Sequence, residues 1–325
     1  MLRLVLAVLA LGTVFVVPMP ASSETPLERG IQLFDQGKLA EAKTTLTPLA
    51  SANPPNVRAA FYLGRIAMRA DDAKEAERWF ETIVKLEPTS SEYHLWLGRA
   101  YGQRARQSSK LTQMGWAKKT KAEFERATEL DPDNLEARSA LIDYFLQAPG
   151  FLGGGVDKAR DQAEEIRKRD PYRGMLADAR IAEDQKDVAA AERAYLEAVR
   201  SRPDSLSGRY TLANFYARTD RHDRAFETFD GILSDKPGDL IALYGIGRTG
   251  AVSGHRLDRA EVALKEYLAA PQPENGPSAA AAHWRLGMVY EKGGRKDEAR
   301  REYQQSLALD PDFGEAKKSL AKLKD

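Results

Sequence analysis

Residues 206–239 form a unit of 34 residues that much of the chain repeats. In its first half, apolar and aromatic side chains recur at the spacing of one helix face: Tyr210, Leu212, Ala213 and Tyr216. A polar break at 219–222 precedes a second half with the same kind of spacing. Pro237 and Gly238 then end this half, because proline cannot continue a helix and glycine suits the position after one. The pattern predicts two short amphipathic helices per unit.

The same residue types return at the same offsets along the chain. Two units repeat a large apolar residue, a small residue and a closing proline: Leu63, Gly64 and Pro88, and Leu286, Gly287 and Pro311. We divide the chain into eight units, at residues 24–56, 57–90, 91–134, 135–171, 172–205, 206–239, 240–279 and 280–313. About ten extra residues lie between Tyr101 and Phe124, where we expect them to extend the helices of their repeat, and about five lie around 150–155. Residues 314–325 are expected to form a capping helix, because the end of a stacked array must be covered.

Two short helices in 34 residues, with a small residue at their crossing and a proline at the close, resemble the tetratricopeptide (TPR) repeat. The resemblance implies an all-α, right-handed superhelical solenoid whose concave groove commonly holds peptides. The absence of alternating apolar runs agrees with an all-α chain. Because each repeat packs only on its neighbours, 325 residues can form one continuous array.

The first 23 residues differ from the repeats. Arg3 precedes an apolar run at 4–17, and small residues follow at 21–23. This order predicts a secretory signal cleaved after Ala21 or Ser23. The run of fourteen residues is shorter than the roughly 20 that a membrane helix needs, so no span is expected in the mature chain. An uncleaved membrane anchor and a disordered cytoplasmic leader are the alternatives.

The sequence contains no cysteine, which excludes disulfides, thiolate nucleophiles and cysteine-ligated zinc. Loss of the leader would remove Arg3 and leave 48 Lys and Arg residues against 48 Asp and Glu residues. Nucleic-acid binding requires a basic excess on one face, so we expect no nucleic-acid partner.

Motifs that resemble catalytic sites do not fit their positions on the repeats. Residues 245–250 spell GIGRTG, but a dinucleotide site needs a preceding strand and a phosphate at the start of the next helix. Here the motif falls inside the first helix of a repeat, where its glycines are expected to permit close helix packing. No GxSxG occurs, and no histidines share a helix face with carboxylates at metal-ligand spacing. We therefore expect a non-enzyme with no cofactor and no metal.

Three glycines at 153–155 precede a helix expected to start near Asp157. Their backbone N–H groups could hold an anion. We favour a turn with positive φ, in which Phe151 and Leu152 pack against the array, because Lys158 already lies inside the helix. With the preceding run AKKTKAEFERATELDP, the loop is similar to that of a group of exported bacterial TPR proteins.

The resemblance places the first helix of each unit on the inner face. Arginines recur there at one position, each four residues after an apolar or aromatic residue: Arg65, Arg99, Arg180 and Arg248, after Phe61, Leu95, Leu176 and Tyr244. Tyr210 and Trp284 hold the apolar position in two units that lack the arginine. Guanidinium groups bind carboxylates in a forked geometry, which favours a peptide with acidic or C-terminal carboxylate groups. The alternative is internal pairing with nearby acids: Glu92, Asp143, Glu183 and Glu291.

These observations predict a non-enzymatic interaction scaffold in the bacterial envelope, periplasmic or secreted, that binds peptides or proteins in its concave groove. The alternative from another class is an accessory subunit or a cryptic hydrolase with a site near residues 150–155.

Overall fold

The computed structural model describes residues 24–271 and 276–323, so the expected signal lies outside the described residues. Within them, seventeen α-helices and one 3₁₀ turn form, and no strand occurs. In order they are α1 (Pro26–Asp35), α2 (Leu39–Ala50), α3 (Val57–Arg69), α4 (Ala73–Leu86), α5 (Ser91–Gln107), α6 (Lys110–Leu130), α7 (Leu135–Gln147), η1 (Gly150–Leu152), α8 (Val156–Arg169), α9 (Pro171–Asp184), α10 (Val188–Ser201), α11 (Leu206–Arg218), α12 (His222–Asp235), α13 (Leu240–Ser253), α14 (Leu257–Ala269), α15 (Ala279–Lys292), α16 (Lys296–Leu309) and α17 (Gly314–Lys322).

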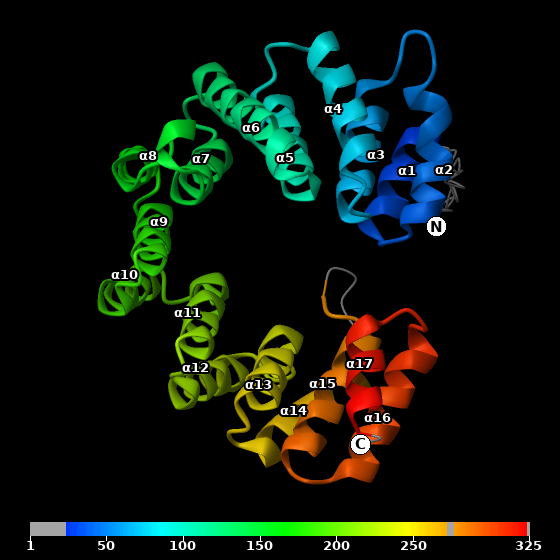
Figure 1. Cartoon of the computed structure of the whole chain (residues 1–325), viewed down its shortest axis with the longest axis vertical. Helices are drawn as coiled ribbons and strands as arrows, with labels where there is room; N and C mark the ends of the chain where they lie inside the picture. Colours follow the sequence, from blue (N-terminus) through cyan, green and yellow to red (C-terminus); the bar gives the residue numbers. More distant parts are fainter. Residues whose placement is uncertain (1–23, 272–275, 324–325) are drawn as a thin grey trace, which may run out of the picture.

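Sixteen of these helices follow one another as eight pairs, and α17 packs on the last pair. The pairs are arranged around an open arc, with the first helices α5, α7, α9, α11, α13 and α15 toward its inner side (Figure 1). The expected all-α repeat solenoid with one terminal helix is therefore confirmed. No helix in the described part of the chain is both long and apolar enough to cross a membrane.

Polar side chains fix where many helices begin. Asn56 Oδ1 accepts a hydrogen bond from the backbone N–H of Ala59, and Asp72 Oδ1 accepts one from Glu75, each over 2.9 Å. These bonds satisfy N–H groups that have no partner inside a helix, and such a cap typically contributes about 1 kcal/mol. The starts of these helices are thus fixed by residues next to them in the sequence.

A glycine of the first helix meets a large side chain of the second helix in several pairs. A Cβ added at Gly64 would lie 2.6 Å from the Phe80 ring, and one at Gly98 would lie 2.5 Å from the Phe124 ring. The second glycine is ten residues further from its aromatic partner than the first, which locates the extra residues between them. They lengthen α5 to 17 and α6 to 21 residues, so the expectation of extended helices rather than a separate domain is confirmed.

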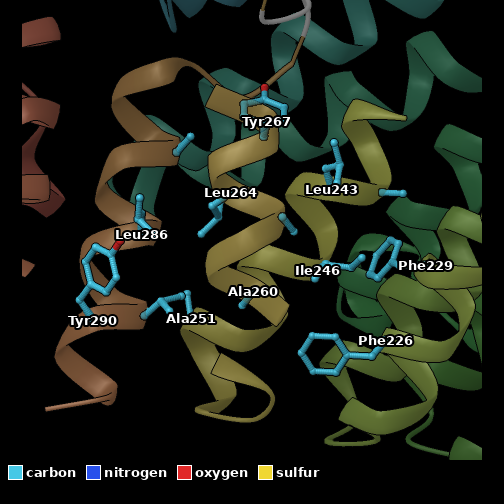
Figure 2. Packing of buried hydrophobic residues seen from close by; sticks show 14 of the residues in the cluster. Phe226, Phe229, Leu243, Ile246, Ala251, Ala260, Leu264, Tyr267, Leu286 and Tyr290 are labelled. Atoms are coloured by element: carbon cyan, nitrogen blue, oxygen red, sulfur yellow. The ribbon is translucent and has the colours of Figure 1, made fainter. Parts of the chain in front are cut away.

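The GIGRTG motif lies inside α13, as expected. A Cβ added at Gly245 would lie 2.4 Å from Phe229 of α12, and one at Gly247 would lie 2.2 Å from Leu264 of α14. The glycines therefore let three helices approach closely. Figure 2 shows the result, a core in which buried side chains of α12, α13, α14 and α15 meet.

Candidate functional site

Arg65 of α3 lies among four aromatic rings. Its guanidinium carbon is 4.6 Å from the centroid of Phe34, 5.3 Å from Tyr62 and 5.4 Å from Trp96. Phe61 is the fourth ring, at 5.6 Å. Among the described residues Arg65 has no carboxylate partner. Its N–H groups are thus available to a ligand, while the rings hold its side chain in place.

Arg99 of α5 is close to Arg65 and is only weakly paired. Its guanidinium lies 4.7 Å from the Trp96 ring and 3.8 Å from Glu136 Oε2 on α7. Burial lowers the pKa of Arg99, the Glu136 carboxylate opposes this, and the charge of Arg65 lowers the pKa further. Arg65 and Arg99 therefore form a cationic pair on the inner face, here called the first arginine station.

The other two arginines of the register differ from each other. Arg180 donates from Nε to Oδ1 of Asp143 over 3.1 Å, so this side chain is paired internally. Arg248 donates to the amide oxygen of Asn214 and has no carboxylate partner among residues 24–271 and 276–323. Burial and the neighbouring charge of Arg285 lower the pKa of Arg248.

Several residues that were expected to line the groove pack against other side chains instead. Phe61 is 8% exposed and Leu95 is 3% exposed, so both belong to the core. Trp284 donates from Nε1 to Ser319 Oγ of α17 over 3.1 Å and meets the Phe313 ring, so the terminal helix covers it. The groove therefore presents its arginines more than these apolar residues.

The tyrosines of the groove are partly buried. Tyr244 packs on the Tyr267 ring, with centroids 5.4 Å apart. Tyr210 lies against the same core, and burial together with its bond to Asp239 raises the pKa of Tyr210. Both tyrosines therefore take part in the packing of the core.

Of the acids expected to neutralise the register, only Asp143 contacts one of its arginines within the described part of the chain. Glu183 accepts hydrogen bonds from Arg218 at 2.8 and 2.9 Å, and Glu291 accepts one from Tyr303. Glu136 was not expected from the sequence, although it contacts both Arg99 and Arg173. Its place in the first turn of a neighbouring inner helix is the only sequence signal that could have pointed to it.

The loop before α8 makes a turn in which the N–H groups of the glycines at 153–155 are bonded to backbone carbonyls. Gly153 and Gly155 have positive φ, as expected. The N–H groups of all three glycines at 153–155 donate to carbonyls of Gly150, Pro149 and Phe145. The expected tucking of Phe151 is wrong, because this side chain is 76% exposed; only Leu152 is half-buried, and its carbonyl accepts a bond from Tyr144.

A cavity of about 660 Å³ opens between α5, α6, α7 and η1. Arg99 of the first arginine station belongs to its wall, and Met114 of the α6 extension and Phe151 line it as well. Trp116, by contrast, packs inside the extension, with its ring 5.6 Å from that of Tyr101. The sequence predicted both insertions but could not show that they enclose a common space.

The described residues hold no group of three or more His, Asp and Glu side chains that could bind a metal. Two of the histidines have structural partners: His94 contacts Glu123 at 2.6 Å, and His283 contacts Glu302 at 2.7 Å.

Two family models match the chain. Residues 33–99 match a tetratricopeptide repeat, and residues 175–309 match the middle TPR-like domain of cilia and flagella-associated protein 70. No curated protein matches. Among solved structures, a thermophilic TPR protein of Thermus thermophilus is 20% identical over 58% of this chain and 96% of its own, with a TM-score of 0.49. A tetratricopeptide repeat protein of Parabacteroides merdae is 14% identical over 83% of this chain and 99% of its own, also with a TM-score of 0.49.

Proposed function

Because this chain is a tetratricopeptide repeat protein, we propose that it is a non-enzymatic scaffold in the bacterial envelope that binds an extended peptide of a partner protein in its concave groove. TPR domains generally bind proteins or peptides. The observation that carries the proposal is the first arginine station, Arg65 and Arg99, which has a single carboxylate, Glu136, at 3.8 Å among the described residues.

The positive charge of the first arginine station favours a partner peptide that carries a carboxylate. The two adjacent guanidinium groups have one weak ion pair, to Glu136 at 3.8 Å, and Glu92 acts on Arg99 from further away. An acidic side chain or a terminal carboxylate would add a closer partner for their charge. A partly desolvated contact of this kind contributes about 1.5–3 kcal/mol, whereas a solvent-exposed pair contributes about 0–1 kcal/mol. The half-buried side chain of Arg65, fixed among rings, favours the first case.

A second station supports the same interpretation further along the groove. Arg248 has an amide rather than a carboxylate as its partner, and the charges of Arg285 and Arg218 add to its field. Arg180 lies between the two stations along the chain but is paired with Asp143. A peptide that follows the groove would therefore meet positive charge at two separate places.

The place of action is proposed from the leader. Arg3, the apolar run at 4–17 and the small residues at 21–23 favour export and cleavage. The alternative is anchoring by an uncleaved leader. Intact-mass measurement of the protein from its source cells tests this, because a mature chain that still begins at Met1 would refute cleavage.

Capture from an envelope extract, with identification of the bound segment, provides the peptide to be titrated. Arg65→Ala combined with Arg99→Ala should weaken its binding by about tenfold or more, and the loss should shrink as ionic strength rises. Arg69→Ala is the matched control: it stacks on the same Phe34 ring, at 4.1 Å, but lies outside the register. If the double variant binds normally and only melts at a lower temperature, the arginines are structural and the proposal fails.

The alternative is an accessory subunit or a cryptic hydrolase with a site near residues 150–155, where the N–H groups of the glycines at 153–155 already donate to backbone carbonyls. Hydrolase assays on the pure protein address it directly.

A further inference from the structure

The cavity between α5, α6, α7 and η1 is built by the two insertions that set this chain apart from a regular array. The extended helices α5 and α6 supply Arg106, Gln113, Met114 and Ala117, and the glycine loop supplies Phe151 and Leu152. Its volume of about 660 Å³ lies within the range of about 300–1,000 Å³ typical of ligand sites.

One wall of the cavity is cationic. Arg99, Gly102 and Arg106 are three, four and seven residues apart on α5, so they lie on one helix face, and all three line the cavity. Arg106 is exposed and has no carboxylate partner within the described part of the chain. Gly102 has no side chain, and Nη1 of Arg106 lies 3.9 Å from where a Cβ would stand, so the Arg106 guanidinium reaches back over this position.

Another wall of the cavity carries carboxylates, and each of them has a cationic partner. Glu136 and Asp143 of α7 line the cavity. Glu136 is paired with Arg173 of α9, and Asp143 is paired with Arg180 of the same helix. Glu136 also lies 3.8 Å from Arg99. Two cations of α9 and two of α5 thus surround two carboxylates, which leaves a positive excess at the cavity.

Between these walls apolar side chains alternate with polar ones, which are Gln113, Thr120, Ser139 and Gln147. Ala105, Ala117, Phe124 and Tyr144 line the cavity from three helices. Two large apolar side chains stay exposed beside them, Met114 at 45% and Phe151 at 76%. Exposed apolar side chains that gather around a concavity mark a binding surface rather than a random scatter.

We propose that this cavity binds the carboxyl-terminal end of a partner peptide, with one or two apolar side chains inside it and the terminal carboxylate at Arg99 and Arg106. At the end of a peptide, the terminal carboxylate and the last side chain belong to the same residue. A cavity with apolar side chains and with cations on one wall can therefore hold both. Arg99 also belongs to the first arginine station, and Met68 of α3 lines the cavity. The chain leading to the bound end would therefore continue over Arg65. This inference rests on the proposed groove function and names the end of the peptide that anchors it.

Fluorescein-labelled hexapeptides that end in Leu, Phe or Trp with a free carboxyl group serve as probes in fluorescence polarisation, each compared with its C-terminal amide. At least one free acid should bind about tenfold or more tightly than its amide, because the amide cannot form the charge-assisted bonds. Arg106→Gln should remove most of that difference. Equal binding of acid and amide, or no binding of any probe, overturns the proposal. Octanoate that binds as tightly as the best peptide would show a site for free acids and also overturn it.

Gly102→Leu blocks the cavity without an expected loss of folding. A Cβ at Gly102 would lie 3.6 Å from Thr120 and 3.9 Å from Nη1 of Arg106, both ordinary contacts. Leucine also favours a helix more than glycine does. This variant should melt no lower than the wild type and lose probe binding by about tenfold or more, because the side chain fills the space that the apolar end occupies. The matched control is Gly115→Leu on α6, which has no atom within 4 Å of an added Cβ and does not line the cavity. If the blocked variant binds the probes like this control, the proposal fails.

The two proposals fail in different ways. If Gly102→Leu binds the captured partner normally while the double arginine variant does not, the groove function stands and the anchoring cavity is wrong. If the probe peptides bind the wild type and not Gly102→Leu, but Arg65→Ala binds the captured partner normally, the cavity proposal stands and the proposal of an extended groove is wrong.

Discussion

Nε of Arg180 on α9 donates a hydrogen bond to Oδ1 of Asp143 on α7 over 3.1 Å, which joins two successive repeats across the inner face. At the same position of α3, Arg65 has rings around it and no carboxylate among the described residues. One register of the repeat therefore holds two kinds of arginine. The difference arises from the residue that the neighbouring repeat offers, aspartate in one case and aromatic side chains in the other.

Arg180→Ala should leave partner binding nearly unchanged, whereas Arg65→Ala should weaken it. Both members of the Arg180–Asp143 pair are about half exposed, so its loss should cost only about 0–1 kcal/mol of unfolding free energy. Titration of the captured peptide against each variant, with thermal unfolding measured in parallel, checks this. Equal loss of binding in both variants would show that internal pairing does not decide which arginines serve the ligand.

The sequence predicts the helices and their pairing well, because small and large residues recur at fixed offsets. Gly64 with Phe80 and Gly98 with Phe124 are readable in the sequence and meet in the structure. The groove residues were harder to predict. Phe61 and Trp284 hold the expected register but are covered, one by neighbouring rings and the other by α17. Such coverage depends on contacts between repeats, which a periodic pattern does not specify.

Gly287→Ala should destabilise the last repeat. The added Cβ would lie 2.4 Å from a ring carbon of Tyr303, which is fully buried. Overpacking of this kind costs about 1–3 kcal/mol, against a gain of about 0.5–1 kcal/mol in helix propensity. Thermal unfolding should show a lower midpoint. Gly115→Ala, exposed in α6 with no atom within 4 Å, is the control and should raise the midpoint; equal shifts of both variants would contradict the close contact.

Gly154→Ala should disrupt the loop that closes the cavity. An added Cβ would lie 1.7 Å from the carbonyl oxygen of Ala148, a backbone atom that cannot move without shifting the end of α7. The variant should melt lower than the wild type and bind the hexapeptide probes more weakly. Gly150→Ala, in the same loop with nothing within 4 Å, should behave like the wild type. Normal melting of the first variant would mean that the loop has another conformation.

The α6 extension should resist trypsin because Trp116 holds it to α5. The Trp116 ring packs on Tyr101 and lies 4.8 Å from the Arg104 guanidinium. Trp116→Ala should therefore speed cleavage between Arg104 and Lys119, measured as the rate at which the intact band disappears. The control is Leu111→Ala, which removes a side chain that is 88% exposed and should leave the rate unchanged. Rapid cleavage of the wild type would show a loose loop instead.

Deletion of residues 315–325 should expose the last apolar face and lower both solubility and the unfolding midpoint. Trp284 would lose its bond to Ser319, and Tyr303 would lose the cover that Leu320 and Leu323 supply to the same core. An array whose last face is uncovered has no neighbour to bury it, so association of the exposed faces is expected.

Sedimentation velocity and light scattering at rising concentration check the deletion. Two point variants of α17 separate capping from the simple loss of residues: Leu320→Ser removes an apolar contact to the core, and Lys318→Ser changes an exposed position on the same helix. The first should reproduce part of the association and of the lower midpoint, and the second should not. Unchanged solubility and an unchanged unfolding midpoint after the deletion would show that exposure of the α16 face to water does not destabilise the protein. In that case α17 does not act as a cap.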